Sequence, residues 1–390
     1  MIDLAKRQFL KRGLSGLSVC GVGAIWSGVI IGGCTSRAVL QAPDEHGVKV
    51  RAGLQVRIIA RSGQSVMTGG NYLWHDAPDG GACFMTNDGG WVYVSNSEIM
   101  HTGGVGAITF GADGAIRRAY SILEKTDRNC AGGATPWRSW LSCEETPTGR
   151  VWECYPNGQS PAKVCPALGV FNHEAVAVDE VNLQLYLTED EKDGGLYRFT
   201  ADRLNVDGFP DLTSGTLEVA VMYDGQRSQL DWAVVPDPLA RHKATRYQVP
   251  SLRQFNGGEG IAYFDGRIIF TTKGDNRVWS YLIATKEIEI MYDASNTAMF
   301  NNAAPMLTGV DNVTVSQKGD VYVAEDGGDL QIVVIDTYGK LYPIMQLAGH
   351  ELSEITGLAF SPDGKRLYFS SQRGTSGLSS GGITYEIQGF

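Results

Sequence analysis

The sequence predicts an all-β fold, a six-bladed β-propeller, from three observations. A strand-like segment that ends in polar residues occurs six times, with a period of roughly 45 residues. Each copy has the period-2 alternation of a strand and is rich in β-branched or aromatic residues. Glycine is abundant, at 49 of 390 residues, as a fold with many tight turns requires. Repeats of this length, with four short strands each, are typical of propeller blades.

The six copies indicate one blade each. They read WVYVSNSE at 91–98, SWLSCEE at 139–145, LQLYLTEDE at 183–191, RIIFTTKGD at 267–275, DVYVAEDGG at 320–328 and RLYFSSQRG at 366–374. We take as equivalent points Glu98, Glu144, Glu189, Lys273, Glu325 and Gln372. The longest step, from residue 189 to residue 273, indicates an insertion around residues 200–250 whose composition is typical of a loop.

Two further strands, one near each end of the chain, predict how the ring closes. LQVRIIA at 54–60 and GITYEIQGF at 382–390 each stand alone in the sequence. Pairing them in one blade would close the ring and remove an exposed strand edge. We therefore expect residues 51–390 to form one propeller that carries the functional site.

The N-terminus resembles a twin-arginine export signal. Lys6 and Arg7 precede an apolar, glycine-rich run over residues 13–33. The run is also long enough for a transmembrane anchor. The IGGC ending at Cys34 favours cleavage, with Cys34 lipidated in a lipoprotein signal. We expect residues 1–34 to direct export, residues 35–50 to be a tether, and the protein to reside in the periplasm or be lipid-anchored to the bacterial envelope.

Charge and histidine content exclude two other classes. The net charge is −10, and no Lys/Arg run after residue 12 resembles a nucleic-acid patch. The six histidines are scattered, with no pair at the HxxxH spacing of a helical zinc site. We expect a monomer whose membrane contact is limited to a lipid anchor at Cys34.

The turns that precede the repeated strands predict a cluster of ligands. NHEAVAVD places Glu174 just before an apolar strand, and GGEGIAYFDG does the same with Glu259. Asp311 (beside Asn312), Glu354 and, in RNCAGG, Cys130 follow the same blade period. Because strand entries at one register surround one mouth of the central channel, we expect these side chains to converge there.

A metal cluster is the simplest way to bring these groups together. Any one carboxylate alone would be a capped turn or a surface ion pair, but unpaired carboxylates this close would repel one another strongly. Hard cations such as calcium and ferric iron take carboxylate ligands. Further candidates come at the ends of the repeated strands: Glu144, Glu145, Glu189, Asp190, Glu191, Glu325 and Asp326.

Cys130 fits the same interpretation. Cys154 and Cys165 flank a loop and make a plausible disulfide, and Cys83 and Cys143 could pair, which would leave Cys130 odd. A thiolate among carboxylates needs a metal to stabilise it. A nucleophilic cysteine would want a histidine partner, and none is obviously positioned for that role.

Several motifs together resemble the PhoX-type alkaline phosphatases from about residue 125 to the C-terminus. They are NCAGGATPWRSWLSCEE, HEAVAVD, YLTEDEKDGGLYRF, GEGIAY, KGDNRVW, GVDNVTV, YVAEDGG and ITGLAFSPDGKRLYFSSQRG. The resemblance implies a six-bladed propeller exported by the twin-arginine route. It also implies two ferric ions (Fe³⁺) and calcium ions (Ca²⁺) at the channel mouth, and small phosphomonoesters as substrates.

The resemblance also implies roles for individual residues. The iron-binding cysteine is Cys130, and the acidic ligands fall most naturally on Glu174, Glu259 and Asp311. One departure concerns the family's phosphate-contacting arginine, whose place is taken here by Gly257. The candidates to replace it are Arg128, Arg253, Lys273 and Arg373.

The sequence therefore predicts an exported metal-dependent phosphatase whose metals bind the phosphoryl oxygens and supply the nucleophile. One alternative is a calcium-dependent, lactonase-like propeller hydrolase, which would need no thiolate. The other is a non-catalytic propeller in which calcium stabilises the fold and the protein binds a partner.

Overall fold

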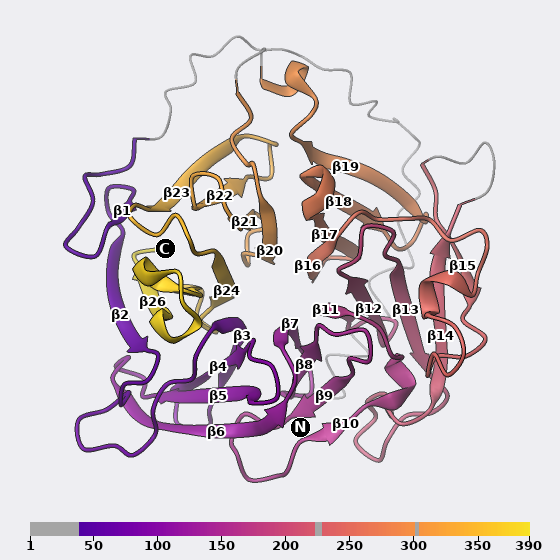
Figure 1. Ribbon diagram of the computed structural model, residues 1–390, viewed down its shortest axis with the longest axis horizontal. Helices are drawn as coiled ribbons and strands as arrows, with labels where there is room; N and C mark the ends of the chain where they lie inside the picture. The colour runs from indigo at the N-terminus through magenta and orange to yellow at the C-terminus, as the bar shows by residue number, and fades with distance from the viewer. Residues whose placement is uncertain (1–38, 223–227, 301–303) are drawn as a thin grey trace, which may run out of the picture. The chain divides into compact units, whose positions relative to one another are not determined.

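The computed structural model describes residues 39–222, 228–300 and 304–390. Six antiparallel sheets surround a central axis, with the first strand of each sheet nearest to it (Figure 1). The predicted six-bladed propeller is confirmed. Within the described ranges, all helical segments are short 3₁₀ turns: η1 (Pro166–Leu168), η2 (Thr245–Tyr247), η3 (Lys273–Asp275), η4 (Thr297–Phe300), η5 (Gly374–Ser376) and η6 (Ser379–Gly381).

The first three blades follow one another along the chain. Blade one contains β3 (Pro78–Met85), β4 (Trp91–Ser97), β5 (Gly103–Phe110) and β6 (Ile116–Thr126). Blade two contains β7 (Asn129–Ala134), β8 (Trp140–Glu144), β9 (Val151–Cys154) and β10 (Lys163–Val164). Blade three contains β11 (His173–Asp179), β12 (Gln184–Glu189), β13 (Leu196–Ala201), β14 (Gly215–Val221) and β15 (Asp231–Val234).

The other three blades follow, and blades five and six each include one strand from the start of the described chain. Blade four contains β16 (Gly258–Phe264), β17 (Arg267–Thr272), β18 (Arg277–Leu282) and β19 (Glu287–Asp293). Blade five contains β20 (Val310–Val315), β21 (Val321–Glu325), β22 (Gln331–Ile335), β23 (Leu341–Leu347) and, at its outer edge, β1 (Val48–Val50). Blade six contains β24 (Ile355–Phe360), β25 (Arg366–Ser371), β26 (Ile383–Gln388) and β2 (Gln55–Arg61).

The ring closes as predicted, in blade six. The N-terminal strand β2 runs antiparallel to the C-terminal strand β26, with Val56 opposite Ile387. A second closure was not predicted: β1 pairs with β23, and Val48 is only 2% exposed. The last three residues of the predicted tether at 35–50 therefore belong to blade five. The predicted export signal at 1–34 and the first residues of the tether lie outside the described residues.

The predicted loop-like insertion at 200–250 contains regular structure. β14 is the ordinary fourth strand of blade three, and β15 adds a fifth, with Val219 opposite Ala233. The prediction was wrong for these two strands: β14 (GTLEVAV) ends in three consecutive buried residues, and β15 pairs along its outer edge. The stretch after β15 carries η2, which bears Arg246.

The hydrophobic core lies between the blades. Buried residues form six clusters, and each cluster joins neighbouring blades. Between blades six and one, for example, the rings of Tyr93 and Tyr368 stack with centroids 4.8 Å apart. Each second strand is therefore covered on both faces, which explains why strands such as β8 are buried at every residue.

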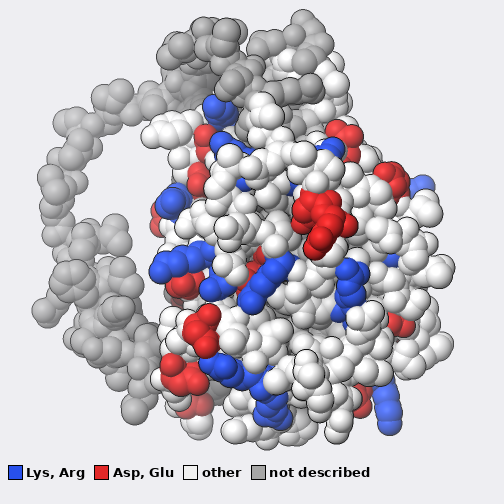
Figure 2. Space-filling view, turned by 90° about the vertical axis from the view of Figure 1, so that its left-hand side faces the viewer, with Lys and Arg blue, Asp and Glu red and all other residues white. Residues whose placement is uncertain are grey.

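The surface carries charges of both signs. On the face shown in Figure 2, lysines and arginines are interspersed with acidic residues. None of the helices in the described part of the chain has the length and apolar character needed to cross a membrane.

Candidate metal centre

A β-bulge at the start of the first strand creates the site. In β11, His173 lies opposite Glu189 while Val176 lies opposite Leu187, so three steps on β11 match two on β12. The same irregularity occurs in β3, β7, β16 and β20. An extra residue in a strand bends it and re-aims a side chain. In each of these five strands the second residue lies in the bulge. These residues are Asp79 in β3, Cys130 in β7, Glu174 in β11, Glu259 in β16 and Asp311 in β20.

Blade six departs from this register. In β24 the bulge lies between Thr356 and Ala359, and Thr356 is the second residue of the strand. Its hydroxyl donates a hydrogen bond to the carbonyl oxygen of Pro78 at 2.8 Å. Glu354, which the sequence predicted at this register, comes two residues earlier. It nevertheless reaches the same mouth, close to Asp311.

Four groups of ligand atoms form at this mouth, and within each group the atoms lie within 4.8 Å of one another. The groups are Asp79–Glu98–Cys130, Cys130–Glu145–Glu174, Glu174–Glu259–Asp311 and Asp311–Asp326–Glu354. Neighbouring groups share a residue, so together they form a continuous arc. Five predicted ligands are thereby brought together: Cys130, Glu174, Glu259, Asp311 and Glu354.

The arc concentrates negative charge where water is largely excluded. Glu174 and Glu259 are 1% and 2% exposed. Burial, followed by repulsion from neighbouring carboxylates, raises the pKa of both groups well above the ordinary value. Burial raises the pKa of Asp311 to about 6, although Lys273 opposes the shift. Burial and then the charge of Glu98 raise the pKa of Glu145 to about 8.

These residues fit bound cations. One side-chain oxygen of Glu174 and one of Glu259 are buried without a hydrogen-bond partner. The Glu259 oxygen lies 3.1 Å from the ammonium group of Lys273, whereas Glu174 forms neither a hydrogen bond nor an ion pair with the described residues. Leaving such a buried oxygen unpartnered is costly, and a bound cation would compensate it. Several carboxylates around one mouth suit hard cations, and the single thiol adds a softer ligand of the kind that binds iron or zinc. Burial and nearby carboxylates raise the pKa of Cys130, so a cation is also what would favour its thiolate.

Two predicted ligands, Glu144 and Glu189, do not join the arc. Glu144 accepts hydrogen bonds from the backbone N–H groups of Asp127 and Arg150, both at 3.1 Å. Glu189 accepts from Gly195 N–H and the Tyr197 hydroxyl, and it pairs with Arg246. Both carboxylates hold loops in place. The sequence repeat aligned these two residues with Glu98 and Lys273, but Glu98 and Lys273 directly follow their strands, whereas Glu144 and Glu189 are the last residues of theirs.

The residues one position later are the ones that face the mouth. Successive strand residues point to opposite sides, so a one-residue error in register exchanges the two faces. Glu145 and Asp326 enter the ligand groups, as does Glu98 in blade one. Asp79 was missed altogether. Its segment DGGAC has the order acid–Gly–x–Ala found in EGIAY around Glu259, and this parallel was the signal that could have found it.

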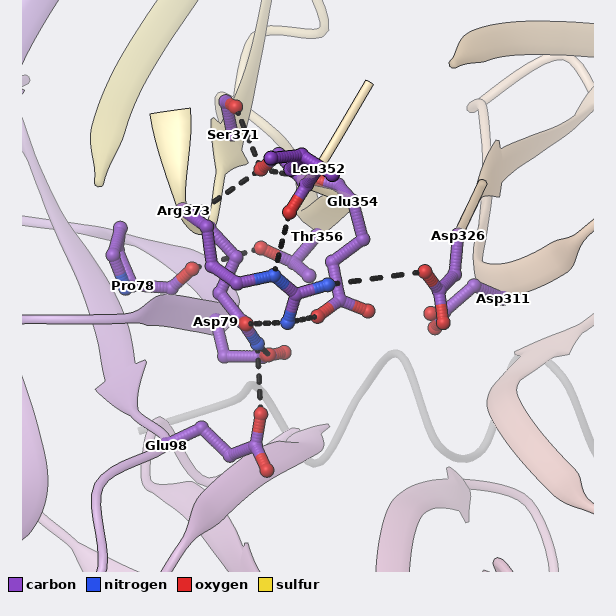
Figure 3. A network of polar contacts seen from close by, with 12 residues as sticks. Pro78, Asp79, Glu98, Asp311, Asp326, Leu352, Glu354, Thr356, Ser371 and Arg373 are labelled. Carbon is purple, nitrogen blue, oxygen red and sulfur yellow. Dashed lines mark hydrogen bonds and ion pairs between the residues drawn. The ribbon is translucent and has the colours of Figure 1, made fainter. Parts of the chain in front are cut away.

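Three basic residues surround the arc, and all three were predicted as candidates to bind phosphate. Arg128 pairs with Glu98 at 2.7 Å and with Glu145 at 2.9 Å. Lys273 lies 3.1 Å from both Glu259 and Asp326. Arg373 pairs with Glu354 at 2.7 Å and points toward Asp326, as Figure 3 shows. Their side chains are between 31% and 40% exposed, so they line the open rim.

Arg253, the other basic residue considered, lies elsewhere. Its guanidinium is over the rings of Phe255 and Trp279, at 5.3 Å and 5.4 Å from their centroids. Gly257 adopts a left-handed φ of 68°, and a Cβ atom there would come within 3.2 Å of a carboxylate oxygen of Asp190. A larger residue at this position would therefore be strained.

The cysteines are unpaired throughout the described residues: Cys83, Cys130, Cys143, Cys154 and Cys165. The plausible Cys154–Cys165 disulfide and the Cys83–Cys143 pairing are therefore absent. Cys143 and Cys154 instead face Val151 and Trp140 across the β8–β9 ladder. Cys130 is therefore distinguished by its position in the bulge of β7. The argument that disulfide pairing leaves it as the odd cysteine does not apply.

Comparison with known proteins now identifies the family. The family model described as alkaline phosphatase PhoX matches residues 115–162, 153–265 and 262–374. The chain belongs to the PhoX family. It is therefore an alkaline phosphatase-like enzyme, a phosphoric monoester hydrolase. The family is metal-dependent, and the acidic groups at the mouth could bind metal. The lactonase-like and non-catalytic alternatives are not supported by this membership.

Solved structures share the fold. The structure of Pseudomonas fluorescens PhoX in complex with vanadate, a transition state analogue, aligns with a TM-score of 0.72 at 17% identity, over 90% of this chain and 97% of that chain. A protein of unknown function from Bacteroides thetaiotaomicron aligns with a TM-score of 0.52 at 11% identity, over 86% of this chain and 76% of that one. Comparison with curated protein sequences gives no match.

Proposed function

We propose that this PhoX-family enzyme is an exported phosphatase that hydrolyses small phosphomonoesters at an iron and calcium cluster in the channel mouth. The observation that carries the proposal is the arc of four ligand groups, in which a buried oxygen of Glu174 has no hydrogen-bond partner. A non-catalytic surface has no need for such costly, buried and mutually repelling groups.

The chain offers two kinds of ligand, and they suggest where each metal binds. Cys130, at the junction of two ligand groups, would hold iron together with Glu174. Groups made of carboxylates alone, such as Asp311, Asp326 and Glu354, would hold calcium. When bound, such metals neutralise charge on the phosphoryl oxygens and activate water as the nucleophile.

The protein's own cations would orient the substrate. Arg128 pairs with Glu98, and Arg373 pairs with Glu354 and donates a hydrogen bond to Gln372. Gln372 in turn links Asp79 and Glu98 through its side-chain NH₂ group. A guanidinium can hold two phosphate oxygens with parallel hydrogen bonds. We propose that Arg373 and Arg128 clamp the phosphoryl group, because each has an exposed portion at the rim and is already held by acids of the site.

The location of the enzyme is part of the proposal. The Lys6-Arg7 motif and the following apolar run support export by the twin-arginine route, and Cys34 supports a lipid anchor. Fractionation of cells that express the full chain tests this. The protein should appear in the periplasm or the membrane fraction, and retention in the cytoplasm after substitution of both Lys6 and Arg7 by Gln would agree with it. Equal export of that variant would contradict the twin-arginine route.

The catalytic proposal is tested by removing and restoring the metals. Purified protein should hydrolyse p-nitrophenyl phosphate, lose turnover after exhaustive chelation, and recover when ferric iron and calcium are added together. Elemental analysis of the same samples should show metal content rising and falling with activity. Full turnover by protein verified to be free of metal would overturn the proposal.

A further inference from the structure

The metal arc has a repeating geometry that relates it to the spaces between blades. At the channel mouth, three residues border the space between two neighbouring blades. Two of them come from the earlier blade: the second residue of its innermost strand, and the residue that directly follows its next strand. The third is the second residue of the innermost strand of the later blade. Between blades one and two these are Asp79, Glu98 and Cys130, which form one ligand group. Between blades two and three they are Cys130, Glu145 and Glu174, which form another.

The space between blades four and five follows the same geometry but has a different charge. Its three residues are Glu259, Lys273 and Asp311. Lys273 thus stands where the first two spaces have a carboxylate. Among the six residues that directly follow a second strand, it alone is basic; the set is Glu98, Glu145, Asp190, Lys273, Asp326 and Gln372.

The ammonium group of Lys273 lies between two acids of the arc. Its nitrogen is 3.1 Å from a side-chain oxygen of Glu259 and 3.1 Å from one of Asp326. The contact with Glu259 is an ion pair, and the side chain of Glu259 is almost completely buried. The lysine therefore acts on Glu259 mainly through its charge, as a bound cation would.

The backbone fixes this placement. The N–H group of Lys273 donates to the carbonyl oxygen of Gly257 at 2.8 Å, and the next N–H group, from Gly274, donates to Asn256 at 3.0 Å. Lys273 also begins the 3₁₀ turn η3. The side chain consequently starts from a fixed point beside the mouth.

We infer that Lys273 is a built-in cation that occupies the space between blades four and five in place of a divalent metal ion. This inference rests on the proposed function, because it concerns how the same metal arc is charged. The tethered ammonium compensates Glu259 and Asp326 permanently, whereas a calcium ion would dissociate on chelation. Replacing it with a carboxylate should turn this space into an additional calcium site.

Calcium stoichiometry tests the inference. Wild type, Lys273→Glu and the control Lys286→Glu are equilibrated in calcium, freed of excess by gel filtration, and analysed for calcium per chain. Lys286 is a suitable control because it pairs with Asp231 away from the mouth and is about half exposed. Lys273→Glu should bind one more calcium ion per chain than wild type, while Lys286→Glu should not. Equal calcium in folded Lys273→Glu and wild type would overturn the inference.

A second variant covers the case in which Lys273→Glu fails to fold. Lys273→Gln removes the charge and keeps a polar side chain, so its melting temperature in chelator should fall below that of wild type and recover when calcium is added. An unchanged melting temperature in chelator would overturn the inference. If the melting temperature of Lys273→Gln in chelator is unchanged and its KM for p-nitrophenyl phosphate is raised, Lys273 is a phosphate ligand, and the inference is again overturned.

The same samples separate this inference from the proposed function. Wild type without metal and without turnover would refute the phosphatase cluster. The difference in calcium between Lys273→Glu and wild type would still decide the role of the lysine.

Discussion

Two neighbouring rows of acids, one residue apart, have different roles in this protein. The last residues of β8, β12 and β21 are Glu144, Glu189 and Glu325, and the next residues are Glu145, Asp190 and Asp326. The first row, which we call the loop-holding row, is satisfied by hydrogen bonds within the protein. Glu325, for example, accepts from the backbone N–H groups of Thr308 at 2.8 Å and Gln331 at 2.9 Å.

The second row, which we call the mouth-facing row, supplies two members of the ligand groups, Glu145 and Asp326. The two rows are separated along the strand by only about 3.3 Å, the rise of one residue. Residue type therefore does not determine function here; the face of the strand does. The comparison teaches that an acidic pair such as Glu144-Glu145 combines a structural group with a functional one.

The largest effect should come from the first-strand acid at the centre of the arc. We expect Glu174→Gln to lower p-nitrophenyl phosphate turnover by roughly 10³-fold, because it removes a charge shared by two ligand groups. Glu325→Gln, in the loop-holding row, should retain turnover at low temperature. Steady-state kinetics on both variants measures the contrast. If both variants lose the same fraction of turnover, the functional distinction between the acids at the channel mouth and the loop-holding row is wrong.

Stability should show the opposite contrast. Glu189→Ala should lower the free energy of unfolding by about 3 kcal/mol, because it leaves the largely buried Arg246 without one of its partners. Glu145→Gln should instead stabilise the metal-free protein, because burial and repulsion from Glu98, which raise the pKa of Glu145, outweigh its ion pair with Arg128. Urea denaturation in chelator measures both. Destabilisation of the metal-free protein by Glu145→Gln would mean that this row is also structural.

The metal-free protein should lose stability as the pH rises. The pKa of Asp311 is raised to about 6 and that of Glu145 to about 8, both chiefly by burial. A carboxyl group with a raised pKa binds its proton more tightly in the folded state, so its contribution is complete below its unfolded pKa and is lost as pH rises through the folded value. Each such group changes stability by at most about 1.4 kcal/mol per pH unit.

Melting temperatures in chelator from pH 4 to pH 9 check this expectation. They should fall across the range, and calcium should stabilise the protein most at the alkaline end, where the ligands are ionised. A chelated protein that becomes more stable between pH 5 and pH 8 would contradict the assigned directions.

A smaller effect is expected at the rim. Arg373→Lys keeps the charge but loses the two-pronged geometry, so KM for p-nitrophenyl phosphate should rise about tenfold, a cost of about 1.4 kcal/mol. Arg117→Lys is the matched control, since Arg117 forms an exposed pair with Asp113 outside the arc. An unchanged KM in Arg373→Lys would exclude Arg373 as the phosphate clamp and turn attention to Arg128.

The blade architecture could be predicted because strand alternation and a repeating length are local properties of the sequence. The ring closure followed from two unpaired strands at the ends. β1 escaped prediction because three residues are too short to carry a pattern, and its place is set by the free edge of β23. β14 and β15 were obscured by the loops around them.

The candidate site was partly predictable for a similar reason. Cys130, Glu174, Glu259 and Asp311 occupy one position in repeated motifs, so their convergence followed from the repeat. Glu144 was chosen over Glu145 because strand faces depend on where each bulge lies, which adjacent acids in a sequence do not reveal. The placement of Glu354, two residues before Thr356, likewise depends on the displaced bulge in blade six.

The most direct test of the metal-centre account is elemental analysis of wild type, Cys130→Ala and Cys143→Ala, purified in parallel. Cys143 is a buried free thiol in β8 that belongs to none of the ligand groups found among the described residues, so it controls for loss of a cysteine as such. Iron and calcium should be present in wild type and Cys143→Ala, and Cys130→Ala should lose its iron. Wild type free of bound metal, or Cys130→Ala with an undiminished iron content, would contradict the account.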